Sequence, residues 1–133
     1  DLGFLKGSNK SGKSRFRDGT KFVPKNDPSI EFYQISWNKE KQRKTGAKRK
    51  DFVSGYAMHN VFEDFAESYT FYRLHGEKFR TMAAQSPILS KKYNFMKKKV
   101  FRGTEFQLEK TNITPINWGL WDTTLVQFEV DNL

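Results

Sequence analysis

Residues 52–74 constrain the fold of this sequence most, because this aromatic-rich stretch repeats its apolar side chains at helical spacing. The repeat advances by three and four residues, which predicts an amphipathic α-helix with one apolar face. Asn60 is a favoured N-cap, since its side-chain oxygen accepts hydrogen bonds from the free amides of a first helical turn. We therefore predict a helix that begins directly after Asn60, with an apolar stripe formed by Phe62, Phe65, Ala66 and Tyr69.

Two glutamates, Glu63 and Glu67, lie one turn apart on this predicted helix and point to the same side. Like charges at this spacing destabilise an isolated helix by roughly 0.2–0.5 kcal/mol, so a nearby cation would relieve the repulsion. A lysine or arginine from elsewhere, a histidine or a metal ion could provide the charge. The structural alternative makes Glu63 the capping-box partner of Asn60 and Glu67 a solvated charge. Spacing alone favours this structural alternative.

The order of residues around the two glutamates resembles the third-ligand helix of the gluzincin zinc metallopeptidases, most closely their anthrax lethal factor-like catalytic domains. The resemblance covers residues 52–101 and is strongest over residues 54–68. It is carried by Ser54-Gly55-Tyr56, Asn60 and Glu63-Asp64-Phe65-Ala66-Glu67-Ser68, and more weakly by Phe79-Arg80, Ser86-Pro87, Tyr93-Asn94-Phe95-Met96 and Phe101.

This resemblance implies roles for three side chains. The first glutamate of the Glu-x-Phe-Ala-Glu pattern is the third zinc ligand in the family, which places a zinc ligand at Glu63. The second glutamate orients a ligand histidine and falls on Glu67. A tyrosine seven residues before the ligand donates to the oxyanion, and Tyr56 occupies that position. The implied function is a zinc-dependent endopeptidase that acts on a peptide or protein substrate and is secreted or extracytoplasmic.

The sequence departs from the family pattern because it lacks a His-Glu-x-x-His motif, which supplies two zinc ligands and the general base. Its histidines are His59 and His75, and neither is followed by a glutamate in the required register. We expect the motif to come from an upstream segment or a companion chain, so residues 1–133 alone should be inactive. Asp1-Leu2-Gly3 would suit the continuation of such an upstream helix. We expect His59 to lie on the substrate side or to pack, and not to bind zinc.

The length suits one domain or part of one, and the expected fold class is α+β, mostly helical and similar to the C-terminal subdomain of a zincin. We divide the chain into a basic, loop-rich segment (1–50), a helical core with the zinc-ligand helix (51–101) and a β tail (102–133). The sequence has no cysteine and therefore no disulfide, and it has no apolar run of membrane length.

Turn and cap residues locate the remaining elements. Residues 22–37 contain two prolines and are predicted to be extended or turn-rich. Gly76 predicts a helix end after His75, followed by a short helix over residues 77–84. Ser86-Pro87 should open another helix that ends near Lys97–Lys99, where cations favour the helix dipole. Period-two alternation predicts strands over residues 103–109 and 123–130.

Positive charge is concentrated in the first 50 residues, which hold 14 Lys and Arg against 5 Asp and Glu, whereas residues 51–133 are balanced. The run from Lys39 to Lys50 contains no aromatic residue and should be an exposed loop. An alternative function follows: a non-catalytic module that binds nucleic acid or an acidic partner through residues such as Lys48, Arg49 and Lys50. A degenerate peptidase domain is a further alternative.

Gly7 and Gly12-Lys13-Ser14 match the spacing of a phosphate-binding P-loop. A P-loop follows a buried apolar strand and opens a helix, and its sheet carries an aspartate that helps to bind Mg²⁺. The flanking sequence provides none of these features, so we do not assign a nucleotide site.

If the run from Lys39 to Lys50 binds a polyanion, the affinity for heparin or RNA should fall steeply as salt rises, because binding releases condensed counterions. Titrations at two ionic strengths measure this dependence. Neutralising Lys48, Arg49 and Lys50 together should weaken binding. Salt-insensitive binding, or binding that survives the triple substitution, would contradict the assignment.

Overall fold

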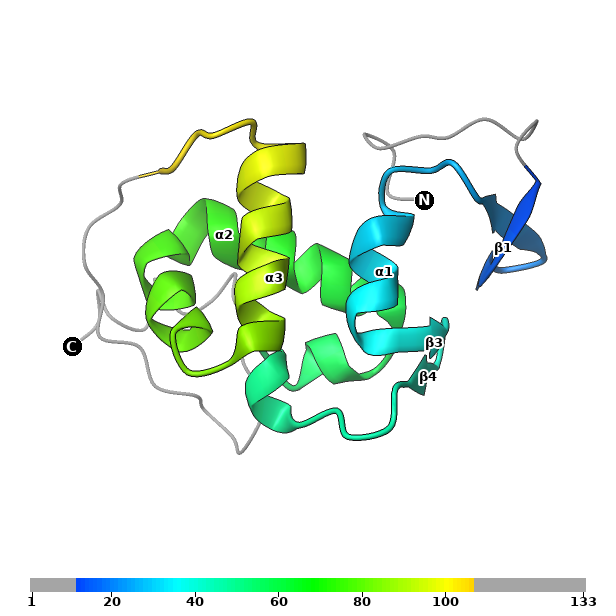
Figure 1. Cartoon of the computed structure of the whole chain (residues 1–133), viewed down its shortest axis with the longest axis horizontal. Helices are drawn as coiled ribbons and strands as arrows, with labels where there is room; N and C mark the ends of the chain where they lie inside the picture. Colours follow the sequence, from blue (N-terminus) through cyan, green and yellow to red (C-terminus); the bar gives the residue numbers. More distant parts are fainter. Residues whose placement is uncertain (1–11, 107–133) are drawn as a thin grey trace, which may run out of the picture.

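Three helices and two short hairpins form the described part of the chain, residues 12–106 of a computed structural model (Figure 1). The predicted α+β class is confirmed. The elements, in chain order, are β1 (Lys13–Asp18), β2 (Lys21–Pro24), α1 (Ile30–Ser36), β3 (Trp37–Lys39), β4 (Gln42–Arg43), the 3-10 turns η2 (Arg49–Asp51) and η3 (Tyr56–Met58), α2 (Val61–Ala83), α3 (Pro87–Phe95) and the π-helical turn η4 (Met96–Val100).

The strands form two separate antiparallel pairs, β1 with β2 and β3 with β4. In the first pair Asp18 faces Lys21, and Gly19 makes the turn with φ of 64°, a conformation that glycine adopts without strain. Residues 12–50 therefore contain more regular structure than the predicted loop-rich segment. The run from Lys39 to Lys50 is mostly exposed, as predicted, but it includes β4 and the start of η2 and is not a simple loop.

Two of the three predicted helix starts, after Asn60 and at Ser86-Pro87, are confirmed by their caps. The Asn60 side chain accepts a hydrogen bond from the backbone N–H of Glu63 at 2.8 Å, and α2 begins at the next residue, Val61. Ser86 does the same for Leu89 at 3.0 Å, with Pro87 as the first residue of α3. Such caps stabilise a helix by about 1 kcal/mol each because they satisfy amides that the helix leaves free.

The prediction for residues 22–37 is wrong over residues 30–36, which form α1. Asp27 explains the start of this helix, because its carboxylate accepts from both the N–H and the hydroxyl of Ser29, at 2.9 and 2.6 Å. The Asp27 side chain thus organises the turn that leads into the helix. Helix α1 then buries Phe32 and Tyr33 in the core.

Helix α2 continues to Ala83 through a kink at His75, where φ is −137° and ψ is 45°, so the predicted helix end at His75-Gly76 is a bend and not a break. Both residues are buried, and Gly76 does not take the left-handed conformation expected of a C-terminal cap. Aromatic packing spans the bend, since the ring of Phe71 lies 5.3 Å from that of His75 and 5.9 Å from that of Phe79. Core contacts therefore hold the two halves of α2 together.

An aromatic cluster joins the three helices. Phe32 of α1, Phe65 of α2 and Phe95 of α3 lie with ring centroids 5.1 to 6.1 Å apart, mostly edge to face. Such ring pairs add about 0.5–1.5 kcal/mol each to the burial of their area. The predicted stripe on α2 is shifted: Phe65 is buried, whereas Phe62, Ala66 and Tyr69 are half-buried and the polar Asp64 and Ser68 are buried in their place.

Asp64 and Lys92 form an ion pair inside the protein, with both side chains fully buried and Nζ 2.8 Å from Oδ2. The indole N–H of Trp37 donates to the same carboxylate oxygen at 2.9 Å. The Lys92 ammonium also donates to the backbone carbonyl of Asp51 at 2.8 Å and lies 3.8 Å from the ring centre of Phe52. Burial raises the pKa of Asp64 and lowers the pKa of Lys92, and in each case the charge of the other residue opposes the shift.

The end of the described chain, residues 101–106, packs along α2 and α3. The hydroxyl of Tyr72 donates to the Thr104 carbonyl at 2.6 Å, and Lys97 pairs with Glu105 at 2.9 Å. Gly103 makes a turn with φ of 89°, and residues 103–106 are not part of a strand, which contradicts the start of the first predicted tail strand. The rest of that strand and the strand predicted over 123–130 lie outside the described residues.

Removing one partner of the buried pair should destabilise the protein far more than removing both. Asp64→Ala leaves an uncompensated buried ammonium and should cost roughly 3–5 kcal/mol, whereas Asp64→Leu combined with Lys92→Met should cost less than either single change. Urea unfolding followed by circular dichroism measures these differences, and the exposed Lys91→Met serves as the control. Additive losses in the double variant would show that the pair does not act as a unit.

Candidate functional site

The residues singled out by the resemblance lie on η3 and the first two turns of α2, two elements that pack against each other. Tyr56 opens η3 and is 44% exposed, unusual for so large an apolar side chain in this protein. The imidazole of His59 stands edge-on to the Tyr56 ring at 5.7 Å and is also exposed. Tyr56 and His59 therefore share one solvent-facing turn directly before α2.

Glu63 lies in the first turn of α2 with its side chain exposed. Its backbone N–H is held by Asn60, but within residues 12–106 its carboxylate has no hydrogen-bond or ion-pair partner. The capping-box interpretation of Glu63 requires that carboxylate to bind back to Asn60, and only the first half of the box is formed. The backbone of Glu63 is thus held by the Asn60 cap, whereas its carboxylate is exposed to solvent.

Glu67 is half-buried and is not the solvated charge of the structural alternative. Its Oε1 accepts a hydrogen bond from the hydroxyl of Ser54 at 2.8 Å. The same hydroxyl oxygen accepts from the N–H of Ala57 in η3 at 3.1 Å. Ser54, which is fully buried, therefore connects the turn that carries Tyr56 to the helix that carries Glu63 and Glu67.

Sequence reasoning included Ser54 in the resemblance but did not assign it this positioning role. A serine three residues before an N–H at the start of a turn is a recognisable local signal, because serine hydroxyls bond to nearby backbone amides. The bond to Glu67 could not be read from the sequence, since it depends on how η3 lies against α2.

The described residues do not form a complete metal site by themselves. Within residues 12–106 no three side chains among His, Asp and Glu lie close enough together to hold a metal ion. His75, buried at the kink of α2 against Phe71, belongs to the core. A zinc ion at Glu63 would need further ligands from outside this part of the chain.

Of the residues proposed for polyanion contact, Lys48 and Lys50 are exposed, whereas Arg49 is half-buried. The Arg49 guanidinium donates to the backbone carbonyl of Phe52 at 2.9 Å, and its burial lowers the pKa. Arg49 therefore stabilises the local fold, and the binding test is cleaner with Lys48 and Lys50 than with all three residues.

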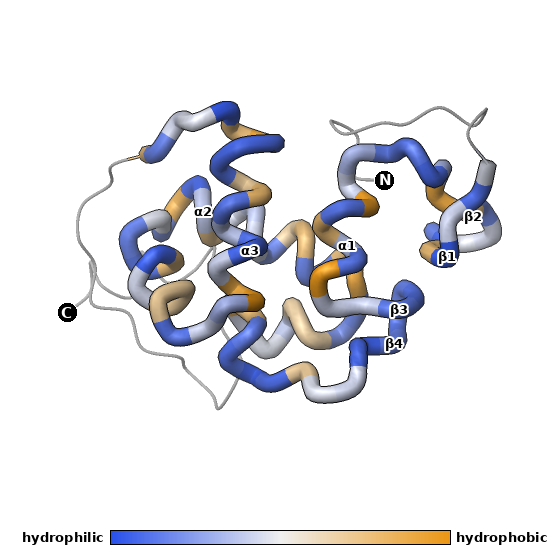
Figure 2. Tube along the Cα trace, in the orientation of Figure 1, coloured by the Kyte–Doolittle hydropathy of each residue, from blue (hydrophilic) through white to orange (hydrophobic). Residues whose placement is uncertain are grey.

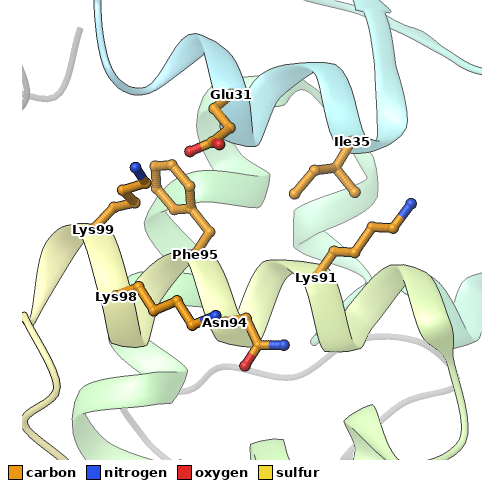
Figure 3. Close-up of a pocket in the computed structure, with 7 residues that line it drawn as sticks. All are labelled: Glu31, Ile35, Lys91, Asn94, Phe95, Lys98 and Lys99. Carbon is orange, nitrogen blue, oxygen red and sulfur yellow. The ribbon is translucent and has the colours of Figure 1, made fainter.

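A groove of about 300 Å³ lies between α1 and α3 (Figure 3). Its floor contains Ile35 and Phe95, and lysines of α3 and η4 stand around it. The lining residues are Glu31, Ile35, Lys91, Asn94, Phe95, Lys98 and Lys99. None of Tyr56, Glu63 or Glu67 contributes to it.

Comparison of the chain with protein-family models, with curated proteins and with solved structures finds no match. Within the described part of the chain, no helix is both long enough and apolar enough to cross a membrane.

Ser54→Ala should destabilise the protein by about 1–3 kcal/mol, because it removes a buried hydroxyl that satisfies both an amide and a carboxylate. Chemical denaturation measures the loss. Thr81→Ala, which removes an exposed hydroxyl bonded to the Glu77 carbonyl, is the matched control and should change stability by less than about 0.5 kcal/mol. A double-mutant cycle with Glu67→Gln should give a coupling energy of at least about 0.5 kcal/mol. A coupling energy near zero would contradict the conclusion that the bond between Ser54 and Glu67 connects η3 to α2.

Proposed function

We propose that residues 12–106 belong to the catalytic domain of a zinc-dependent endopeptidase, in which Glu63 is a zinc ligand and Tyr56 an oxyanion donor. The observation that carries this proposal is the Glu63 carboxylate, exposed and without a partner among the described residues, on a helix start fixed by Asn60. A purely structural glutamate in this position would be expected to complete its capping box. The choice of zinc as the metal rests on the sequence resemblance to the gluzincin peptidases.

The Glu63 carboxylate is suitable as one ligand of a zinc site. A carboxylate oxygen is an accepted zinc ligand, and a catalytic site combines three protein ligands with an open position. Glu63 would hold the metal together with two histidines from outside residues 12–106. When bound, zinc would lower the pKa of a coordinated water and polarise the substrate carbonyl.

The remaining assignments concern what the side chains of this chain do. The Tyr56 hydroxyl, on an exposed turn, would donate a hydrogen bond to the carbonyl oxygen of the peptide bond as negative charge develops on it. Glu67 would orient a ligand histidine, while the bond from Ser54 keeps its side chain in place. The general base would come from the segment that supplies the histidines.

The alternative is a non-catalytic basic module, in which the exposed Lys48 and Lys50 would bind nucleic acid or an acidic partner. In that case Glu63 and Tyr56 are surface residues of a scaffold helix and its preceding turn. A degenerate peptidase domain would keep the arrangement of η3 and α2 without binding metal. Metal content separates these alternatives from the proposed enzyme.

Residues 1–133 alone should bind zinc weakly or not at all, because a catalytic zinc site needs three protein ligands and the described part holds no group of three. Zinc should be retained if the protein extends upstream and that segment supplies a His-Glu-x-x-His helix. In that longer protein Glu63→Gln should lower zinc affinity, and Glu67→Ala should lower it less, by roughly 10–100-fold. Tyr56→Phe should keep the zinc and lose about 2.7–4 kcal/mol of transition-state stabilisation. Elemental analysis and peptide-cleavage kinetics provide the measurements.

Glu31→Gln is the matched control, because Glu31 is also an exposed glutamate in the first turn of a helix. It removes the same charge from the same kind of position and should leave zinc affinity unchanged. Stoichiometric zinc and full activity in Glu63→Gln would refute the assignment of Glu63.

A further inference from the structure

A basic hairpin lies beside the candidate site. It consists of β3, β4 and Lys44, residues 37–44, and it is closed by a hydrogen bond from the Lys44 N–H to the Ser36 carbonyl at 2.8 Å. Figure 2 shows its hydrophilic character along the edge of the helical body. It carries the exposed cationic side chains of Lys39, Lys41, Arg43 and Lys44.

Two hydrogen bonds join the basic hairpin to the segment that carries the candidate site residues. The N–H of Val61, the first residue of α2, donates to the Glu40 carbonyl at 2.8 Å. The Arg43 guanidinium donates to the Met58 carbonyl, the last residue of η3, at 2.9 Å. These bonds lie on either side of His59 and Asn60, so the basic hairpin is held against the short connection between Tyr56 and Glu63.

The charge of the basic hairpin faces solvent with little internal compensation. Its one acidic side chain, Glu40, accepts from the Arg17 N–H at 3.2 Å and also lies 3.9 Å from the Arg17 guanidinium. The Glu40 charge is therefore directed toward β1. Within residues 12–106 no carboxylate pairs with Lys39, Lys41 or Lys44.

We propose that the basic hairpin binds acidic side chains of a peptide that lies across η3 and the start of α2. The ammonium groups of Lys39, Lys41 and Lys44 are the complementary charges for glutamate or aspartate. A peptide is favoured over nucleic acid because Trp37, the one aromatic residue of the hairpin, is fully buried, so bases have no stacking surface among the hairpin lysines. The exposed rings of Tyr56 and His59 lie outside the hairpin, on the turn that the peptide would cross. Calling this peptide the substrate rests on the proposed function and gives a peptidase that prefers acidic residues near the cleaved bond.

The test measures binding without cleavage, on residues 1–133. Two fluorescent peptides are compared, one rich in glutamate and one in which each glutamate is replaced by glutamine. Fluorescence anisotropy at low salt should show preference for the acidic peptide, and the preference should fade when the Debye length drops to about 8 Å at physiological ionic strength. Lys39→Gln, Lys41→Gln and Lys44→Gln combined should weaken binding of the acidic peptide roughly tenfold, the scale of three exposed ion pairs.

The control variant combines Lys91→Gln, Lys98→Gln and Lys99→Gln, the lysines around the groove of Figure 3. It makes the same change in net charge outside the hairpin and should alter binding less than about twofold. A photo-crosslinking form of the acidic peptide should attach within residues 37–63. Crosslinks confined to other residues would overturn the proposed placement.

Three further results would overturn the proposal: equal affinity for the two peptides, equal loss in the two triple variants, or a single-stranded RNA of matched charge that binds at least ten times more tightly than the peptide. The zinc measurements on the longer protein are independent of these readouts. Selective peptide binding without zinc retention would therefore refute the endopeptidase and keep the hairpin assignment, and the reverse combination would do the opposite.

Discussion

The buried ion pair between Asp64 and Lys92 connects more of the fold than any single apolar contact. Asp64 belongs to α2 and Lys92 to α3, and the same two groups bond to the indole of Trp37 in β3 and to the carbonyl of Asp51 in η2. Taking both charges out of water costs several kcal/mol per ion, and the cost is offset only when the geometry and the additional hydrogen bonds are good. The four elements are therefore held in one arrangement, because a shift of any of them would expose a buried charge or remove one of its hydrogen-bond partners.

The aromatic cluster provides stabilisation of another kind. Phe32, Phe65 and Phe95 bury large areas where α1, α2 and α3 meet, and apolar burial is not directional. Such a core favours a compact state without fixing how the helices are rotated. The ion pair fixes that rotation, since its hydrogen bonds require particular faces of α2 and α3 to turn inward.

Local signals in the sequence were sufficient for the helix starts, because Asn60 and Ser86 act on amides within three residues of themselves. The start of helix α1 depends on the bonds from Ser29 to the Asp27 carboxylate, which residue types alone do not distinguish from an ordinary turn. The bend at His75 was misjudged because it depends partly on contacts outside α2, such as the packing of Phe79 on Tyr93 of α3. The buried face of α2 was misjudged for a related reason: Asp64 and Ser68 look like surface residues until Lys92 and Trp37 are placed beside them. The residues of the candidate site were named from the pattern of the sequence, whereas the bond between Ser54 and Glu67 and the attachment of the basic hairpin required the fold.

The inward position of Asp64 also determines where the candidate site faces. Successive residues of an α-helix are rotated by about 100° around its axis, so burying both Asp64 and Phe65 turns Glu63 toward solvent. Glu67, one turn after Glu63, lies on the same side of α2 but is half-buried, and the Ser54 hydroxyl donates to it. The direction of the proposed zinc ligand is therefore set from the interior, by the pairing of the residue beside it.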